Sequence, residues 1–215
     1  MNAPSVRFWD RIAADYAKKP VPDEAAYERT LERVRSHLTP TDRVLELGCG
    51  TGTTALKLAP HARELLGTDY SSEMIAIALA KSRARALAHV SFRACTAHEP
   101  ELGTPPFDVV IAMNLLHLLR DVPAELRRIA ELVRPGGLFI SKTPCVGDQG
   151  LAPRLVVPLL RAVGRAPYVN FVTESSLTGD LTSAGFELLE TGMYPKKSRS
   201  FFVVARRPEA RGSVT

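Results

Sequence analysis

The chain contains little cysteine and no long apolar run, and both shortages narrow the class of protein. Only three of its 215 residues are cysteine, with no CxxC spacing, which argues against a disulfide scaffold and a structural zinc site. No apolar stretch approaches the ~20 residues that a membrane-spanning helix needs, and the apolar segment 155–163 is interrupted by Pro158 and Arg161. Residues 1–10 lack the basic-then-apolar layout of a signal peptide, so we expect a cytoplasmic protein. From the cysteine spacing we expect no bound metal.

Composition and charge are those of an ordinary globular protein. Hydrophobic residues make up 45% and charged residues 24% of the chain, which excludes wholesale disorder. The formal net charge is +5, and basic residues gather at 81–93 and 196–211. Nucleic-acid-binding proteins show a stronger basic face with interleaved aromatic residues, so we interpret these clusters as solvated surface and expect no nucleic-acid partner.

Short β-branched runs alternate with helical patterns, and this alternation predicts an α/β fold with a parallel sheet and crossover helices. The predicted strands are 43–47, 64–67, 90–94, 107–113, 138–142, 186–190 and 200–205. The predicted helices that follow the first strand are 53–58, 71–87, 122–133 and 173–184. Because a short connection joins the last two strands, we expect the final strand to be antiparallel to its neighbours.

A glycine-rich turn after the first predicted strand is the sharpest signal. Residues 44–52 read Val-Leu-Glu-Leu-Gly-Cys-Gly-Thr-Gly, and glycines let a backbone approach a ligand where a Cβ would collide. The spacing is G-x-G-x-G, whereas a dinucleotide fingerprint requires a further glycine at the position of Thr53. The phosphate-loop pattern G-x-x-x-x-G-K-[ST] is missing as well, so an NAD-dependent oxidoreductase ranks last among the candidate functions.

Asp69 is the second signal, because it ends the second predicted strand 21 residues after Gly48. A carboxylate at this place can accept hydrogen bonds from both hydroxyls of a ribose. The structural alternative is a helix cap, a role that Ser71 could share. Both signals lie at the carboxyl edge of adjacent strands, so the ligand-binding interpretation is favoured.

Four blocks in this order resemble the class I S-adenosylmethionine-dependent methyltransferases. They are 44–52, the acidic residue Asp69, 107–117 and 132–140. The segment 8–17 also resembles the cap of small-molecule members, including those of quinone biosynthesis. The resemblance spans roughly residues 8–206 and implies a three-layer, Rossmann-like sandwich with S-adenosylmethionine (SAM) as the cofactor and a seven-stranded, mostly parallel sheet.

The resemblance also implies a division of the single domain, 1–215. Residues 1–38 would form an N-terminal helical cap and residues 43–143 the cofactor-binding core. Residues 144–172 would form an inserted lid, and residues 173–206 a C-terminal helix and hairpin. Each boundary follows a change in pattern, such as the four prolines between 144 and 171.

At the methionine end of the cofactor, the resemblance places the three glycines of the turn against the ligand and Glu46 beneath it. Asn114 would bring its backbone near the sulfonium. The implied set at this end is Glu46, Gly48, Cys49, Gly50, Gly52 and Asn114.

At the adenosine end, the resemblance implies that Asp69 holds the ribose while Tyr70 or Met74 packs near the adenine. One position departs from the family pattern. Many members have an aspartate after the third strand that accepts a bond from the adenine amino group, and Thr96 stands there in this chain. Its hydroxyl could still accept that bond, and the backbone amide of Ala97 could donate to a ring nitrogen.

The acceptor side is marked by fewer residues. His117 follows the fourth predicted strand and is the candidate general base, with simple packing of the following turn as the alternative. The segment 151–163 is either a helix packed on the sheet or a lid, and a membrane-surface contact is the less favoured interpretation. The predicted acceptor pocket comprises Trp9, Tyr16, His117 and Leu155, and Tyr16 would also close over the cofactor.

These inferences predict methyl transfer from SAM to a small, apolar or aromatic acceptor by direct displacement, which requires mainly alignment and exclusion of water. One alternative is methylation of RNA or protein through the basic surface. Another is a cofactor-binding protein without transferase activity. The three cysteines, Cys49, Cys95 and Cys145, leave arsenite-type chemistry as a less favoured alternative.

Overall fold

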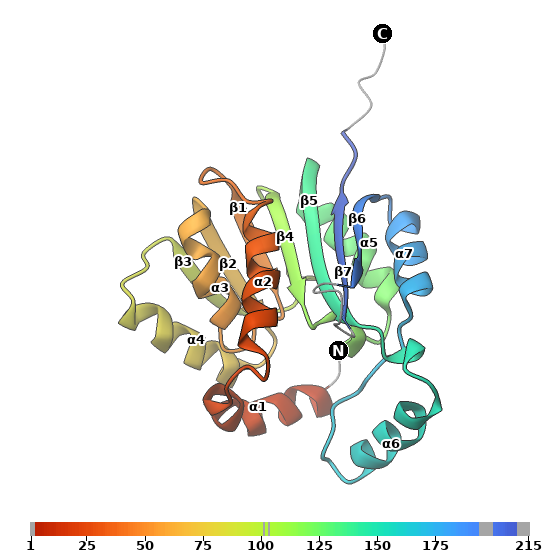
Figure 1. The fold of residues 1–215 in the computed structure, drawn as a ribbon. Helices are drawn as coiled ribbons and strands as arrows, with labels where there is room; N and C mark the ends of the chain where they lie inside the picture. The colour runs from red at the N-terminus through yellow and green to blue at the C-terminus, as the bar shows by residue number, and fades with distance from the viewer. Residues whose placement is uncertain (1–2, 101, 103, 194–199, 210–215) are drawn as a thin grey trace.

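The computed structural model describes residues 3–100, 102, 104–193 and 200–209, and a seven-stranded sheet forms its centre (Figure 1). The strands are β1 (Arg43–Leu47), β2 (Glu64–Asp69), β3 (Val90–Ala94), β4 (Phe107–Met113), β5 (Val133–Pro144), β6 (Glu187–Met193) and β7 (Ser200–Arg206). Their order is β3-β2-β1-β4-β5-β7-β6. Strands β1 to β5 pair in parallel, and β7 pairs antiparallel with β5 and β6. The predicted mixed sheet and its antiparallel last strand are confirmed.

Four strands extend beyond their predicted ends, β7 by the single residue Arg206. Strand β2 continues to Asp69, and β6 continues to Met193, where it still pairs with β7. Strand β5 begins at Val133, opposite Phe107, and the register with β4 then shifts before Leu138. The glycine turn at 135–137 therefore interrupts the pairing inside β5, whereas the predicted strand began only at Leu138.

Helices cover both faces of the sheet. Helices α2 (Glu24–Arg35), α3 (Thr53–Leu58) and α4 (Ser72–Ala84) share one apolar core with Val109 and Ile111 of β4. Helices α5 (Val122–Leu132) and α7 (Glu174–Ser183) share the other core with Val110 and Ala112. Successive residues of a strand face opposite sides, so the unbroken apolar run of β4 serves both cores. Short 3₁₀ turns complete the chain at η1 (Ala59–His61), η2 (Leu116–Leu118) and η3 (Val146–Asp148).

The helix caps explain why the turns at the carboxyl edge are well defined. The side chain of Ser71 accepts a hydrogen bond from the Met74 amide and starts α4. Asp121 accepts one from the Ala124 amide and starts α5. Helix α4 ends three residues earlier than expected, just before Ala86, which has a positive φ of 51°.

Two helices lie at the end of the sheet where the parallel strands terminate (Figure 1). Helix α1 (Ala3–Lys18) packs on α4, and the Ser71 hydroxyl donates to Asp10 Oδ1 at 2.6 Å. Helix α6 (Leu151–Ala162) lies beside α1 and buries none of its residues. The interpretation of 151–163 as a helix packed on the sheet is therefore wrong.

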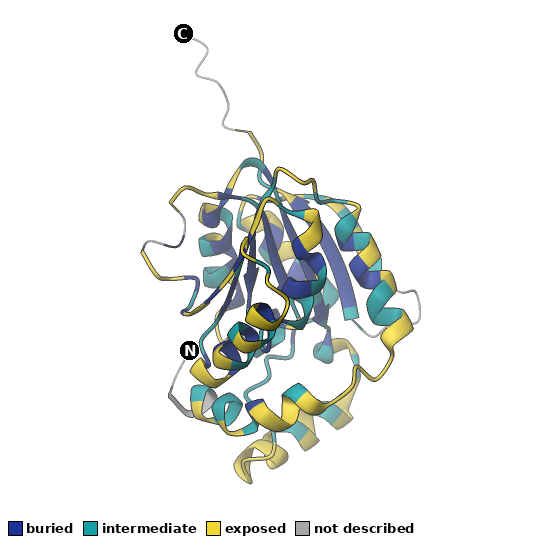
Figure 2. Ribbon diagram, turned by 90° about the vertical axis from the view of Figure 1, so that its left-hand side faces the viewer, coloured by how far each residue is buried: buried dark blue, intermediate teal, exposed yellow. Residues whose placement is uncertain are grey.

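The burial pattern separates these layers. Buried residues concentrate in the sheet and on the inner sides of its helices, whereas the helical segments at the bottom of Figure 2 are largely exposed. No helix in the described part of the chain is long and apolar enough to cross a bilayer. The carboxyl edge of the sheet, lined by loops and capped by α1, is where the candidate site lies.

Candidate functional site

Three neighbouring cavities form one crevice along the carboxyl edge of the sheet. The largest, about 620 Å³, lies between α2 and the ends of β1, β4 and β5, and we call it the α2 chamber. A second cavity of about 60 Å³ lies under α1 (the α1 recess), and a third lies at the end of β3 (the β3 recess). Gly48 lines all three, Gly50 and Asn114 line the first two, and Asp69 lines the last two. Because the cavities share walls, one extended ligand could occupy them together.

The glycine turn forms the common wall of the crevice, and each of its glycines has a positive φ, between +53° and +74°. A Cβ at Gly48 would come within 2.7 Å of Leu115, and one at Gly52 would come within 2.8 Å of Phe92. At Gly50 a Cβ would meet nothing within 4 Å. Packing thus requires two of the glycines, and Gly50 is the one that faces open space where a ligand can approach.

Asp69 connects the glycine turn to the start of α4. Its Oδ2 accepts a hydrogen bond from the Gly50 amide at 3.0 Å, and its Oδ1 accepts one from the Ser71 amide at 2.9 Å. Burial raises the pKa of the carboxyl, and these amide bonds act in the opposite direction. Each oxygen keeps a further lone pair, so Asp69 can hold the loop and still accept bonds from a ligand in the adjoining recesses.

Glu46 supplies an unpartnered polar atom in the wall of the α2 chamber. Its side chain is buried, and Oε2 has no hydrogen-bond partner among the described residues. Burial raises the pKa of this carboxyl to about 8. Buried polar atoms normally have partners, so a cationic donor such as the ammonium group of a methionine moiety fits this place.

The β3 recess contains Thr96 and Ala97, as predicted, together with Glu125, which the sequence analysis missed. Glu125 belongs to the first turn of α5, and His98 Nε2 lies 3.0 Å from its Oε2. Nothing in the sequence distinguishes this glutamate from the charged residues of a solvent-facing helix. The fold therefore brings a carboxylate to the recess where the family's aspartate is missing.

Besides the residues named above, the α1 recess is lined by four further predicted residues, Trp9, Tyr16, Tyr70 and Met74. The rings of Trp9 and Tyr16 meet edge to face, with centroids 6.1 Å apart. Burial raises the pKa of the Tyr16 hydroxyl, and the charges of Asp69 and Glu46 add to this effect. Helix α1 thus places an aromatic wall against the crevice.

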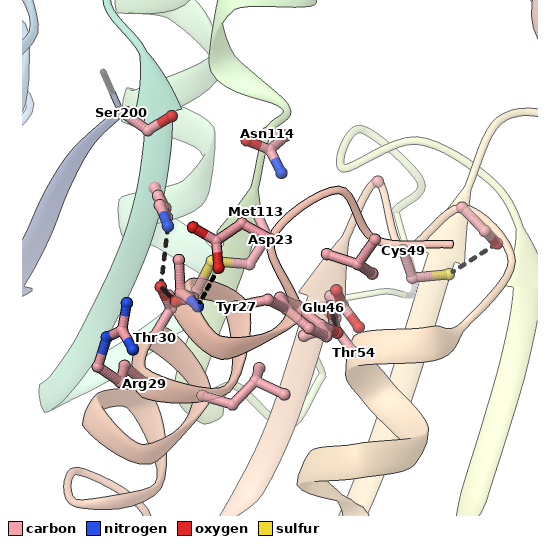
Figure 3. A pocket seen from close by; sticks show the side chains of 16 residues that line it. Asp23, Tyr27, Arg29, Thr30, Glu46, Cys49, Thr54, Met113, Asn114 and Ser200 are labelled. Carbon is pink, nitrogen blue, oxygen red and sulfur yellow. Dashed lines mark hydrogen bonds between the residues drawn. The ribbon is translucent and has the colours of Figure 1, made fainter. Parts of the chain in front are cut away.

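The outer wall of the α2 chamber contains residues that the sequence analysis did not identify (Figure 3). The Tyr27 hydroxyl lies 2.9 Å from Thr54 Oγ1, and burial raises the pKa of Tyr27 to about 12. Lys142 Nζ donates to Thr30 Oγ1 at 2.8 Å, and burial lowers the pKa of this amine. Lys142 forms no ion pair with any described residue. A half-buried cation of this kind is suited to an anionic partner.

Asn114 lies between the α2 chamber and the α1 recess. It adopts a positive φ of 57°, and its amide donates to the Lys142 carbonyl at 2.8 Å. Left-handed backbone at a non-glycine residue costs energy and is found preferentially at functional sites. Asn114 therefore lies at the crevice, and its predicted place near the sulfonium stays a prediction.

His117 and Leu155 do not line the crevice as the described residues define it. His117 lies in η2, burial lowers its pKa to about 4, and Nδ1 has no described hydrogen-bond partner. A base with so low a pKa accepts protons weakly near neutrality. Leu155 is 75% exposed and belongs to α6, a helix that buries none of its residues. The predicted pocket therefore loses these two of its four members.

The three cysteines are free and buried. Burial raises the pKa of each thiol, which keeps it protonated. Among the residues that the structure describes, no three histidines, cysteines or acids are grouped as metal ligands would be. Arsenite-type chemistry, which needs a preorganised set of thiolates, gains no support.

Comparison with known proteins agrees with this geometry. Residues 17–191 match the family model described as a methyltransferase domain. The ubiquinone biosynthesis O-methyltransferase of Azorhizobium caulinodans is 31% identical over 152 residues, which are 69% of this chain and 60% of that protein. The protein of the same name from Xanthomonas axonopodis is 29% identical over 85% of this chain and 76% of its own length.

A solved structure shares the fold. The SAM-dependent methyltransferase from Mesorhizobium loti superimposes with a TM-score of 0.72 at 21% identity, covering 86% of this chain and 99% of that one. This chain spans about three fifths of the length of the Azorhizobium relative. The family match, the sheet order and the glycine turn beside Asp69 lead to one conclusion. The chain belongs to the class I SAM-dependent methyltransferases.

Proposed function

We propose that this protein transfers a methyl group from SAM to a hydroxyl oxygen of a small acceptor whose body is apolar or aromatic. The observation that carries the proposal is the row of three cavities that share Gly48 in their walls and lead from the β3 recess, past Gly50, to the α2 chamber of about 620 Å³. Cavities of about 300–1,000 Å³ are typical of small-molecule sites. The chamber therefore has room for an acceptor beside the methionine part of the cofactor.

In this proposal the cofactor lies along the glycine turn. Asp69 accepts bonds from the ribose hydroxyls, and Glu46 accepts one from the methionine ammonium. Thr96 and Ala97 border the adenine, and Glu125 supplies the carboxylate acceptor for its amino group. When bound, SAM supplies an activated methyl group on a sulfonium with a neutral leaving group.

The acceptor would lie in the α2 chamber, with Met113 and Tyr27 providing apolar and aromatic contacts. The Lys142 ammonium would stabilise an acceptor oxygen as it loses its proton, since a nearby cation lowers the pKa of a hydroxyl. The proton would pass from the acidified hydroxyl to solvent water, so no strong separate base is needed, which agrees with the low pKa of His117. The relatives named O-methyltransferases also favour an oxygen acceptor.

Two competing functions make different demands on the molecule. An RNA or protein substrate would need an open platform around the reacting centre, whereas α2 and α1 wall the crevice on two sides. A binding protein without transferase activity would need no acceptor space, and the α2 chamber is the largest part of the crevice. Both features support a small-molecule transferase.

Titration calorimetry with S-adenosylhomocysteine tests the cofactor half of the proposal. We expect saturable binding that weakens about tenfold or more in Asp69→Ala, because hydrogen bonds to a charged group contribute about 1.5–3 kcal/mol. Glu73→Gln, an exposed position on α4, is the matched control and should bind as the parent does. A screen of phenolic and catecholic acceptors with labelled SAM tests the second half, and transfer only to RNA or protein would refute it.

A further inference from the structure

Helix α6 presents an apolar surface that nothing in the described chain covers. Leu151, Leu155 and Leu159 of α6 and Val163, the residue that caps its end, recur at every fourth position and so share one side. We call them the α6 stripe, and they are 75%, 75%, 68% and 63% exposed. Soluble proteins rarely leave large apolar side chains in a contiguous exposed patch unless the patch is an interaction site.

The sequence around α6 is basic and contains no acid. Between Gln149 and Thr173 there is no aspartate or glutamate, whereas Arg154, Arg161 and Arg165 fall in this interval. None of the three forms an ion pair within the part of the chain that the structure describes. An apolar helix flanked by unpaired arginines is suited to a partner that is both apolar and anionic.

A recess of about 310 Å³ between α1 and the chain after α6 gathers further arginines. We call it the arginine recess, and the residues that matter here are Arg7, Phe8, Arg11, Arg161 and Tyr168. Arg11 donates to the Gly164 carbonyl at 2.7 Å, and the Arg161 guanidinium lies 5.2 Å from the Tyr168 ring centroid. These contacts hold the guanidinium groups in place, and such groups bind phosphate with two parallel hydrogen bonds.

We propose that the α6 stripe and the arginine recess dock the protein on an anionic phospholipid surface. The stripe would enter the boundary between headgroups and acyl chains, while the arginines would bind headgroup phosphates. A two-fold contact would pair this surface with itself, and residues 149–173 contain no acid that could neutralise the arginines of a second copy. A soluble anion or a nucleic acid would leave the α6 stripe in water.

The positions of the α6 stripe and the arginine recess relative to the crevice agree with the proposal. Helices α1 and α6 lie at the same end of the molecule, where the parallel strands terminate (Figure 1). Trp9 and Tyr16 of α1 line the α1 recess, while Arg7 and Arg11 of the same helix line the arginine recess. Docking would therefore bring the membrane next to the crevice. The proposal does not depend on the chemistry of methyl transfer.

Vesicle flotation of the full chain tests the docking surface. We expect the protein to float with vesicles of phosphatidylcholine mixed with phosphatidylglycerol, and to float far less with phosphatidylcholine alone. The double variant Leu155→Ser, Leu159→Ser should weaken binding about tenfold or more through lost apolar insertion. Arg11→Gln with Arg161→Gln should weaken it by about tenfold to thirtyfold, since each basic residue near the surface contributes about 1 kcal/mol.

The control variant Arg83→Gln with Arg85→Gln removes the same charge from exposed positions at the C-terminal end of α4. It should leave flotation unchanged. Titration with S-adenosylhomocysteine shows that each variant is folded and keeps its crevice, so failure here is distinguishable from failure of the proposed function. Equal flotation with both kinds of vesicle would overturn the proposal. Binding of glycerol 3-phosphate without any flotation would also overturn it. So would sedimentation analysis that shows a dimer which the leucine variant dissociates and the arginine variant does not.

Discussion

The two halves of the crevice are built in different ways. The cofactor half depends on a short stretch of backbone, in which Asp69 accepts bonds from the Gly50 and Ser71 amides. The α2 chamber depends on side chains from distant segments, such as Tyr27 of α2 and Lys142 of β5. One half is thus a local motif, and the other exists only after the sheet and α2 have assembled. Substitutions in the two halves should therefore fail differently.

The largest effect should come from the glycine turn. Gly52→Ala adds a Cβ within 2.9 Å of Phe92 and Ala78 at a φ of +74°, and strain together with overpacking should cost about 3 kcal/mol of unfolding free energy. Gly50→Ala faces open space and should cost only about 1–2 kcal/mol, the price of a left-handed alanine. Chemical denaturation measures both. Equal losses would contradict the packing role assigned to Gly52.

Gly50→Ala sharpens the contrast because its effect should fall on the ligand. A methyl group at this position would stand in the space shared by the α2 chamber and the α1 recess. We expect S-adenosylhomocysteine affinity to fall by about tenfold or more, although the variant remains folded. Unchanged affinity would show that the cofactor does not lie along the turn.

The next effect should separate the acceptor half from the cofactor half. Lys142→Met should lower the turnover number about a hundredfold, as expected when a group that stabilises a developing anion is removed. Binding of S-adenosylhomocysteine should not change. Lys142→Arg keeps the charge and should restore part of the rate, as steady-state kinetics with an identified acceptor would show. A Lys142→Met variant with full turnover would remove this lysine from the mechanism.

Glu46 should give the crevice a pH dependence. Its folded pKa of about 8 lies above the ordinary value, so the folded state binds the extra proton, and stability declines as pH rises from about 4.5 to about 8. Glu46→Gln should abolish this decline in denaturation experiments across the same range. A bound ammonium favours the ionised carboxylate, so S-adenosylhomocysteine affinity should rise with pH in the parent and stay flat in Glu46→Gln.

The smallest effect should come from Glu125. Glu125→Gln retains the shape but replaces a charged acceptor, so S-adenosylhomocysteine affinity should fall about threefold to tenfold. The hypoxanthine analogue S-inosylhomocysteine carries a carbonyl oxygen in place of the amino group, so it should bind the variant at least as tightly as the parent. Equal losses for both ligands would indicate that Glu125 acts on the structure of the recess and not on the base.

The local half of the crevice was the part that the sequence could predict. Strands β1, β3 and β4 have their predicted ends, and the glycine turn and Asp69 lie at the predicted edge. Periodicity and turn chemistry are local properties, and these elements obey them. Gly48 and Gly52 lie where expected, but steric contacts with Leu115 and Phe92 explain them as well as a ligand does.

The rest could not be predicted because it depends on tertiary contacts. Glu125 looks like any polar residue of an amphipathic helix until α5 is placed beside β3. Lys142 looks like the end of a strand until α2 covers it. The apolar pattern of α6 is the same in a buried and in an exposed helix, so periodicity alone could not show that this stripe faces outward.

The most direct test of the account is calorimetric titration of S-adenosylhomocysteine into the parent protein, Asp69→Ala and Lys142→Met. The account predicts one site per chain in the parent, binding at least about tenfold weaker in Asp69→Ala, and unchanged binding in Lys142→Met. Absence of binding to the parent, or equal binding by the parent and Asp69→Ala, would contradict the central claim that this crevice holds the methyl donor.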